Sequence, residues 1–393
     1  MIKINSIWVG QGDCTLIETN AGHNSGELIL IDCGTSDSMS IFEENVQPTI
    51  ENILKSYPTT KTKIDYMFLT HSDKDHVNLV KNLLVLSTVS EVTNLYYGGL
   101  LSPYLRYIGI KVGGKWQLDP KIKKVNNIAN YFFNTLAATI IGTPDFKLWI
   151  LSGNYPFKHE PPVAIFDKDV NEAANRKSKP LRSAYDINGN SLIILINYKG
   201  FQAMFMGDAT YFQQQMLLEE LKKAGKEGDS NSISFKMSHH GSPDSFNKEF
   251  TNTAVKPNVI TSSSGITFGH PSLQAIDEIT SIKSGAPMHQ ITLFDESTNQ
   301  YEYYTTDNWV YNTMLMFSES SEFVPTKTKS GKRSRDSHAG EAYTALKGIN
   351  WTLEVDDTGT TYKPKTMGAT AIILTTKDTI NPTSKKSKKG SKT

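Results

Sequence analysis

Short apolar runs alternate with polar, glycine-containing turns over the first 95 residues. Runs of strand length with this boundary chemistry are typical of buried β-strands. We expect strands at KINSIWVG, CTLIET, ELILIDCG and IDYMFLT. Between them, the apolar spacing of residues 41–57 predicts an amphipathic helix, and a second helical pattern begins near Val77. Strands that alternate with helices in this way predict an α/β fold.

Strand signals return in the second half of the chain, after residues 95–185, which we expect to form an insertion. The later strands are expected at SLIILINY, FQAMFMGD, ISFKMSHHG and PNVITSSSG, with a helix over 211–223. We expect residues 1–317 to form one domain, followed by a basic linker at 318–342 and a small β appendage at 343–380 with strands NWTLEVDD and ATAIILTT. Residues 381–393 are low-complexity and basic, which predicts a disordered tail.

The composition argues against a secreted, disulfide-rich or membrane-spanning protein. An apolar content of 38% over 393 residues is sufficient for a large core, and a net charge of +1 gives no overall attraction to a polyanion. The N-terminus does not resemble a signal peptide, and no run approaches the roughly 20 apolar residues of a membrane span. Two cysteines, Cys14 and Cys33, cannot build a disulfide framework. We therefore expect buried thiols, a reducing cytoplasmic setting and no membrane contact.

The densest chemical motif is HSDKDH at residues 71–76, placed between a predicted strand and a predicted helix. It offers four potential metal ligands in six residues of a chain with nine histidines. Imidazole and carboxylate groups together suit a divalent cation. A solvated polar loop is the alternative interpretation of this motif alone.

Three further polar clusters each follow a predicted strand. Asp208 ends FQAMFMGD, His239 and His240 follow ISFKM, and His270 comes after PNVITSS. Each could be an ordinary turn by itself. Because strand ends in α/β proteins gather at one edge, their joint occurrence with the first motif predicts a metal site there.

Here the sequence resembles a known family. HSDKDH resembles the His-x-His-x-Asp-His signature of the metallo-β-lactamase superfamily, with Asp73 in place of the second histidine. This replacement resembles the ComEC/Rec2 branch, the hydrolase domain attached to the bacterial DNA-uptake channel. Further blocks follow in the same order over roughly residues 1–310: VGQGDCTLIE at 9–18, LIDCG at 30–34, NSLIILI at 190–196, MGD at 206–208, SHHGS at 238–242 and FGHPS at 268–272.

The resemblance implies a four-layer αββα sandwich that binds two divalent cations. Its implied ligands are His71, Asp73, Asp75, His76, Asp208 and His270. His71 and Asp73 would serve one metal, Asp75 and His76 the other, with Asp208 as the bridge. The aspartates Asp13, Asp32 and Asp186 are expected beside the ligands, where they could orient them.

One departure concerns the histidine that the superfamily often supplies just before the SLI-type strand. Here Asp186, Asn188 and Asn190 occupy that stretch. The second metal site is then weaker, or is completed by Asp186, by one of the paired histidines or by water. Exchanging imidazole for carboxylate moves the preference from zinc toward manganese, with magnesium as a further alternative.

The function implied by the resemblance is a metal-dependent phosphodiester hydrolase, a nuclease that acts on DNA. Asp75 would orient the nucleophile, and His239 or His240 would bind metal or substrate or protonate the leaving group. Contacts to phosphate are expected from Ser242, Lys332 and Arg333. Two alternatives stay open: a hydrolase of a small ester, lactone, thioester or lactam, which would need an apolar pocket, and a non-catalytic scaffold, which would hold no stoichiometric metal.

Overall fold

The computed structural model describes most of the chain up to residue 263 and several later strands. The described residues are 1–128, 139–153, 187–226, 228, 232–242, 245–257, 259–263, 289–295, 300–306, 309–312, 326–327, 333–334 and 350–367. Among them there is no helix with the length and apolarity needed to cross a membrane.

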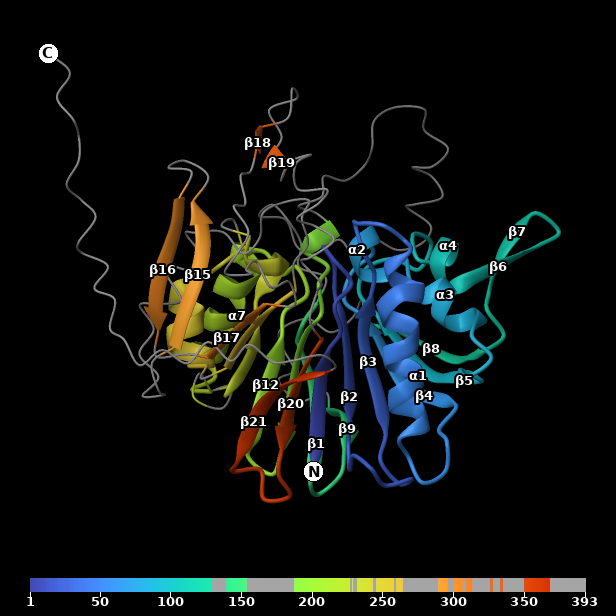
Figure 1. Cartoon of the computed structure of the whole chain (residues 1–393), viewed down its shortest axis with the longest axis horizontal. Coiled ribbons are helices and arrows are strands. Elements are labelled where there is room, and N and C mark those ends of the chain that lie inside the picture. Colours follow the sequence, from blue (N-terminus) through green and yellow to red (C-terminus); the bar gives the residue numbers. More distant parts are fainter. Residues whose placement is uncertain are drawn as a thin grey trace, which may run out of the picture.

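The first sheet has the strand order β21-β20-β1-β2-β3-β4-β5-β8 (Figure 1). Its strands are β1 (Ile2–Ser6), β2 (Cys14–Glu18), β3 (Leu28–Cys33), β4 (Lys63–Leu69), β5 (Glu91–Tyr97), β8 (Ile122–Asn127), β20 (Asn350–Val355) and β21 (Tyr362–Met367). The pairs from β3 to β8 are parallel and the others antiparallel. Cys14 and Cys33 face each other across β2 and β3, and both are buried free thiols, as expected.

The second sheet has the order β17-β14-β13-β12-β11-β10-β9. Its strands are β9 (Thr139–Gly142), β10 (Phe146–Ser152), β11 (Ile193–Tyr198), β12 (Phe201–Phe205), β13 (Ser234–Lys236), β14 (Val259–Ser262) and β17 (Trp309–Asn312). The strands from β12 to β17 are parallel, so that the carboxyl ends of β12, β13 and β14 point to one edge.

Helices cover the outer face of each sheet (Figure 1). Beside the first sheet lie η1 (Phe42–Val46), α1 (Gln47–Lys55), α2 (Lys74–Val77), α3 (Val80–Val85) and α4 (Leu105–Ile108), and beside the second lie α7 (Tyr211–Lys223), η2 (Ser238–Gly241), α8 (Lys248–Phe250) and η3 (Thr251–Val255). Buried side chains form three apolar clusters: one between helices and the first sheet, one between the sheets, and one between the second sheet and α7. Three cores between four layers confirm the predicted αββα sandwich.

The C-terminal strands differ from the predicted arrangement. β20 lies within the predicted appendage at 343–380, yet it pairs with β1 through Ile4 and Leu353 and extends the first sheet. Leu353 and Val355 are buried in the core between the sheets. This part of the chain is therefore integrated into the sandwich rather than forming a separate unit. The run ATAIILTT and the tail at 381–393 lie outside the described residues, as does most of the linker apart from β18 (Thr326–Lys327) and β19 (Arg333–Ser334).

The predicted insertion at 95–185 contributes strands to both sheets. β8 is the edge strand of the first sheet, while β9 and β10 end the second. Between α4 and β8, the hairpin of β6 (Gly109–Val112) and β7 (Lys115–Leu118) projects from the body (Figure 1). A further hairpin, β15 (His289–Asp295) with β16 (Gln300–Thr306), pairs antiparallel.

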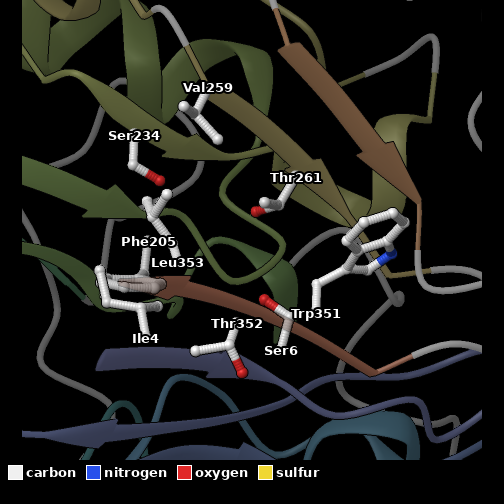
Figure 2. A pocket seen from close by; sticks show the side chains of 9 residues that line it. All are labelled: Ile4, Ser6, Phe205, Ser234, Val259, Thr261, Trp351, Thr352 and Leu353. Atoms are coloured by element: carbon white, nitrogen blue, oxygen red, sulfur yellow. The ribbon is translucent and has the colours of Figure 1, made fainter. Parts of the chain in front are cut away.

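A crevice lies between the two sheets next to β20 (Figure 2). It is lined by apolar and hydroxyl side chains, among them Phe205, Thr261 and Trp351. Its lining contains neither carboxylate nor imidazole groups. The titratable cluster lies elsewhere, at the strand ends.

Candidate metal centre

The clustered imidazoles and carboxylates come from strand ends in both sheets. From the first sheet, His71 follows β4, and Asp75 and His76 lie in α2. From the second, Asp208 follows β12, and the paired histidines follow β13. The carboxyl ends of β4, β12 and β13 thus converge on one edge of the sandwich, as the sequence pattern predicts.

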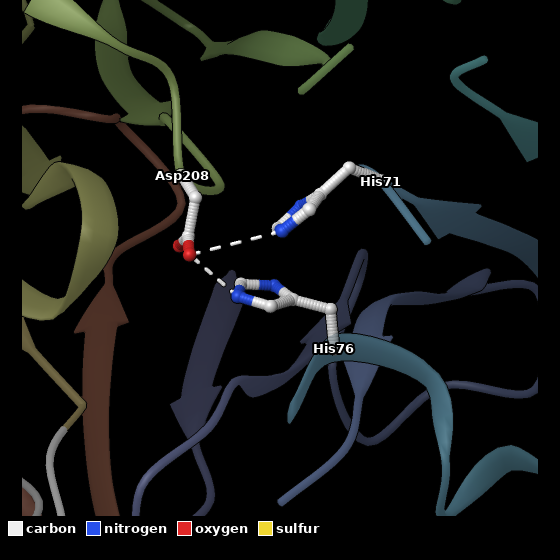
Figure 3. A group of neighbouring side chains, drawn as sticks. All are labelled: His71, His76 and Asp208. Carbon is white, nitrogen blue, oxygen red and sulfur yellow. Dashed lines mark ion pairs between the residues drawn. The ribbon is translucent and has the colours of Figure 1, made fainter. Parts of the chain in front are cut away.

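His71, His76 and Asp208 form the centre of this cluster (Figure 3). Nε2 of His71 lies 3.7 Å from Oδ2 of Asp208, and Nε2 of His76 lies 3.0 Å from Oδ1. All three side chains are buried, and within the described part of the chain these two nitrogens and Oδ1 make no hydrogen bond. Such groups carry a desolvation cost unless a further partner joins them, and a cation is the partner that all three accept.

The hydrogen bonds beneath His71 support this conclusion. The hydroxyl of Thr70 donates its one proton to Oδ2 of Asp32 at 2.7 Å, so it must accept from Nδ1 of His71 at 3.1 Å. That tautomer turns the lone pair of Nε2 toward the carboxylate of Asp208. Two acceptors that face each other at 3.7 Å repel unless a positive charge lies between them, so the geometry fits a bound cation.

A second group shares His76 with the first and adds Asp75 and His240. Nε2 of His240 lies 3.6 Å from Oδ2 of Asp75 and 3.8 Å from Oδ1 of Asp208. The carboxylate of Asp208 therefore reaches both groups, which suits a ligand shared by two cations.

Asp73 and His239 lie at the outer side of the cluster. Oδ2 of Asp73 lies 3.9 Å from Nε2 of His71, and Nε2 of His239 lies 3.6 Å from Oδ2 of Asp208. Their side chains are 30% and 27% exposed, whereas His71 and His76 are fully buried. Among the described side chains of the cluster, Asp73 and His239 are thus the most accessible to solvent or to a substrate.

The electrostatics of the cluster follow from burial and from neighbouring charges. Burial, together with the neighbouring His76, lowers the pKa of His71 to about 3. Burial, with the carboxylates of Asp75 and Asp208, raises the pKa of Asp73 to about 6. Burial alone would lower the pKa of His240, but Asp13 and Asp208 outweigh it and raise that pKa to about 9. The carboxylates crowd one another closely enough that divalent cations would relieve their repulsion.

The paired histidines adopt an unusual backbone conformation. His239 and His240 have φ of 48° and 55°, in the left-handed region that residues other than glycine rarely enter. The backbone N–H of His239 donates to the carbonyl of Gly207 at 3.0 Å, which ties this turn to the one that carries Asp208. Strain of this kind is often found at functional sites, and here it brings both rings to the same cluster.

The structure brings most of the predicted site residues together. The predicted residues around the shared cluster are Asp13, Asp32, His71, Asp73, Asp75, His76, Asp208, His239 and His240. The expected pair of Asp75 and His76 lies in one group, together with His240, and His76 also joins His71 on Asp208. Ser242 is buried behind the paired histidines, where its N–H donates to the carbonyl of His239.

Other predicted residues cannot be placed beside the cluster. Asp186, His270 and Lys332 lie outside the described residues, and Arg333 is described only as part of the backbone of β19. Their roles stay predictions.

Several supporting residues were missed by the sequence reasoning. Thr70 and Ser191 contact Nδ1 of His71, and Lys236 contacts Asp13. Small hydroxyl residues give no sequence signal of such a role. Lys236 does give one, since it is the only charged residue in the otherwise uncharged run ISFKMS.

Comparison with known proteins agrees with the fold. Residues 7–122 match the model of the metallo-beta-lactamase superfamily, and this segment contains the whole HSDKDH motif. No curated protein matches the chain. Among solved structures, similarity is found to a mutant of the CmlA beta-hydroxylase (TM-score 0.34, 13% identity, covering 71% of this chain and 49% of that chain). It is also found to CmlA, a diiron beta-hydroxylase from Streptomyces venezuelae (TM-score 0.31, 11% identity, 70% and 46%).

The chain spans about half the length of those two structures. The TM-scores of both structures are too low to indicate a function for this chain. The informative findings are the superfamily match and the sandwich architecture. The superfamily suggests a metal-dependent hydrolase. Residues 7–122 are thus similar to the metallo-beta-lactamase superfamily, and the structure gathers candidate metal ligands from this segment and from the second sheet.

Proposed function

We propose that this protein is a metal-dependent phosphodiester hydrolase, a nuclease that acts on DNA. The observation that carries the proposal is the buried meeting of His71, His76 and Asp208, where the lone pair of His71 faces the carboxylate and a second ligand group lies alongside. When bound there, two divalent cations would supply a water ionised near neutral pH and would neutralise charge on the phosphate.

The side chains of the cluster divide into inner and outer roles. His71, His76, His240 and Asp208 are buried, which suits groups that hold cations in fixed positions. The carboxylate of Asp75 is 17% exposed and can orient a water beside the cluster. These positions support hydrolysis rather than a purely structural metal site, because part of the ligand set faces solvent.

His239 is suited to move a proton. Its Nδ1 contacts the hydroxyl of Ser245 at 3.0 Å, its Nε2 lies 3.6 Å from Oδ2 of Asp208, and the side chain is 27% exposed. A group so placed can protonate the leaving alkoxide of a substrate that enters from solvent.

A local basic region supports a polyanionic substrate. Besides Lys121, whose Nζ donates to two backbone carbonyls, residues 105–125 contain five cations against one anion, Asp119. The five are Arg106, Lys111, Lys115, Lys123 and Lys124. The projecting β6–β7 hairpin in this region presents exposed Lys111 over the ring of Trp116 at 5.1 Å. A basic arm with an aromatic ring is suited to contact a phosphate backbone and a base.

The basic region includes α4 and the β6–β7 hairpin. The hairpin leaves the body at the end of the sandwich where α2 lies (Figure 1). This placement, with the ComEC/Rec2-like replacement by Asp73, favours DNA over a small ester or lactam.

The test is an assay of purified protein with single- and double-stranded DNA, RNA and bis(p-nitrophenyl) phosphate, each with manganese, magnesium or zinc. We expect cleavage of DNA and of the small phosphodiester, and loss of both in Asp208→Ala, which removes the shared ligand. Asp145→Ala, at an exposed aspartate paired with Lys199, is the matched control and should keep full activity. Wild-type cleavage rates in Asp208→Ala would refute the assignment of the site. A purified protein without stoichiometric metal would support the scaffold alternative.

A further inference from the structure

Lys236 places an ammonium group inside the sandwich, beneath the candidate metal centre. It is the last residue of β13 and is only 7% exposed. Its Nζ lies 2.5 Å from Oδ2 of Asp13 and donates to the carbonyl of Met237 at 3.0 Å. A buried lysine is costly unless it is paired, so its retention at this position calls for a specific use.

The carboxylate that Lys236 binds touches two candidate ligands. Oδ1 of Asp13 accepts a hydrogen bond from the hydroxyl of Ser263 and lies 3.4 Å from Nδ1 of His240. Oδ2, the atom that contacts Lys236, also lies 3.7 Å from Nδ1 of His76. Asp13 thus lies behind both rings, on the side opposite their Nε2 atoms.

Asp32 shows how a neighbouring carboxylate is held without a lysine partner. It accepts from the N–H and the hydroxyl of Thr70, both at 2.7 Å, and from Nδ1 of His76 at 2.8 Å. All of these contacts come from the first sheet. Asp13 is held differently, because its partners come from the other sheet. Asp13 directly precedes β2 of the first sheet, whereas Lys236 ends β13 and Ser263 follows β14 of the second sheet.

This difference matters because the candidate metal centre is divided between the sheets. His71, Asp75 and His76 come from the first sheet, and Asp208 and His240 from the second. The ion pair between Lys236 and Asp13 joins the sheets directly beneath the rings of His76 and His240. Its cation also opposes the repulsion that Asp13 meets from the other carboxylates of the cluster.

We propose that Lys236 is a positioning residue for metal binding. It fixes the carboxylate of Asp13 so that Oδ1 accepts from Nδ1 of His240 and Nε2 of that ring is turned toward Asp75 and Asp208. The inference rests on metal binding at the proposed site and is independent of which substrate is hydrolysed.

The experiment compares Lys236→Met with wild type and with Lys121→Met. Lys121 is the matched control, a partly buried lysine whose Nζ donates to two backbone carbonyls away from the cluster. Titration calorimetry with Co²⁺ gives affinity and stoichiometry, and the visible spectrum of bound Co²⁺ reports its ligand geometry. We expect Lys236→Met to bind Co²⁺ about 10–100-fold more weakly, with an altered spectrum, as for the loss of other groups that orient ligands. Lys121→Met should match wild type in both.

A double variant covers the case in which Lys236→Met does not fold. Asp13→Asn combined with Lys236→Met removes both charges at nearly constant volume, a change that buried ion pairs often tolerate. We expect it to fold and to bind Co²⁺ weakly, because a neutral amide in place of the carboxylate no longer fixes the tautomer of His240. Wild-type affinity and spectrum in either folded variant would overturn the proposal. Absence of DNA cleavage by metal-loaded wild type would contradict only the nuclease function.

Discussion

Thr70 offers a direct test of the hydrogen bonds beneath the candidate ligands. Its hydroxyl donates to Oδ2 of Asp32 at 2.7 Å and contacts Nδ1 of His71 at 3.1 Å, and the residue is fully buried. Thr70→Val keeps the β-branched shape but removes the donor to a charged acceptor. Hydrogen bonds to charged groups are worth about 1.5–3 kcal/mol, so we expect the free energy of unfolding of the metal-free protein to fall by that amount.

The assay is urea unfolding in EDTA, followed by tryptophan fluorescence. Thr70→Ser is the control, since it keeps the hydroxyl and loses one methyl group, a change worth about 0.8 kcal/mol. The reasoning predicts that the valine variant is the less stable of the two. If Thr70→Val unfolds at the wild-type urea concentration, or if the serine variant is equally destabilised, the hydroxyl does not stabilise the site as argued.

Three further outcomes are expected. Removal of metal by EDTA should lower the melting temperature and added manganese or zinc should restore it, because the cation binds only the folded site; an unchanged melting temperature would argue against metal binding. Lys111→Glu with Lys115→Glu should weaken DNA binding and reduce the slope of its salt dependence by about 2, with hydrolysis of a small phosphodiester unchanged; wild-type DNA affinity would remove the hairpin from the substrate path. Gly12→Ala should destabilise the protein by about 1–3 kcal/mol in urea unfolding, since a Cβ there would contact the backbone carbonyls of Gly34 and Asp75; wild-type stability would contradict this close approach.

The sequence predicts the strands better than it predicts their partners. LILIDC is buried at every position of β3, and such continuous apolar runs are recognisable because both faces are covered. The run NWTLEVDD was also recognisable as a strand, but its pairing with β1 joins opposite ends of the chain. Local patterning specifies an extended segment and its buried face, whereas the choice of partner depends on contacts that no sequence window contains.

The candidate ligands were predictable for a similar reason, but the sharing of His76 between two groups was not. Strand ends in an α/β fold meet at one edge, which is sufficient to bring His71, Asp208 and the paired histidines together. The expected pair of Asp75 and His76 lies in one group, but the turn into α2 also places His71 and His76 on the same carboxylate, which the spacing within HSDKDH does not reveal. The left-handed conformation of the paired histidines could not be inferred either, because these residue types rarely adopt it.

The division of the site between two sheets explains why its polar supports matter as much as its ligands. The core between the sheets is apolar, and apolar burial is non-directional, so it holds the sheets together without fixing their alignment closely. Metal ligands, by contrast, need distances correct to about 0.2 Å. Directional contacts at this edge can supply that alignment: Lys236 binds Asp13 across the sheets, and Ser191 of the second sheet contacts both Nδ1 of His71 and the N–H of Asp208. Loss of such a contact should therefore impair metal affinity more than it impairs folding.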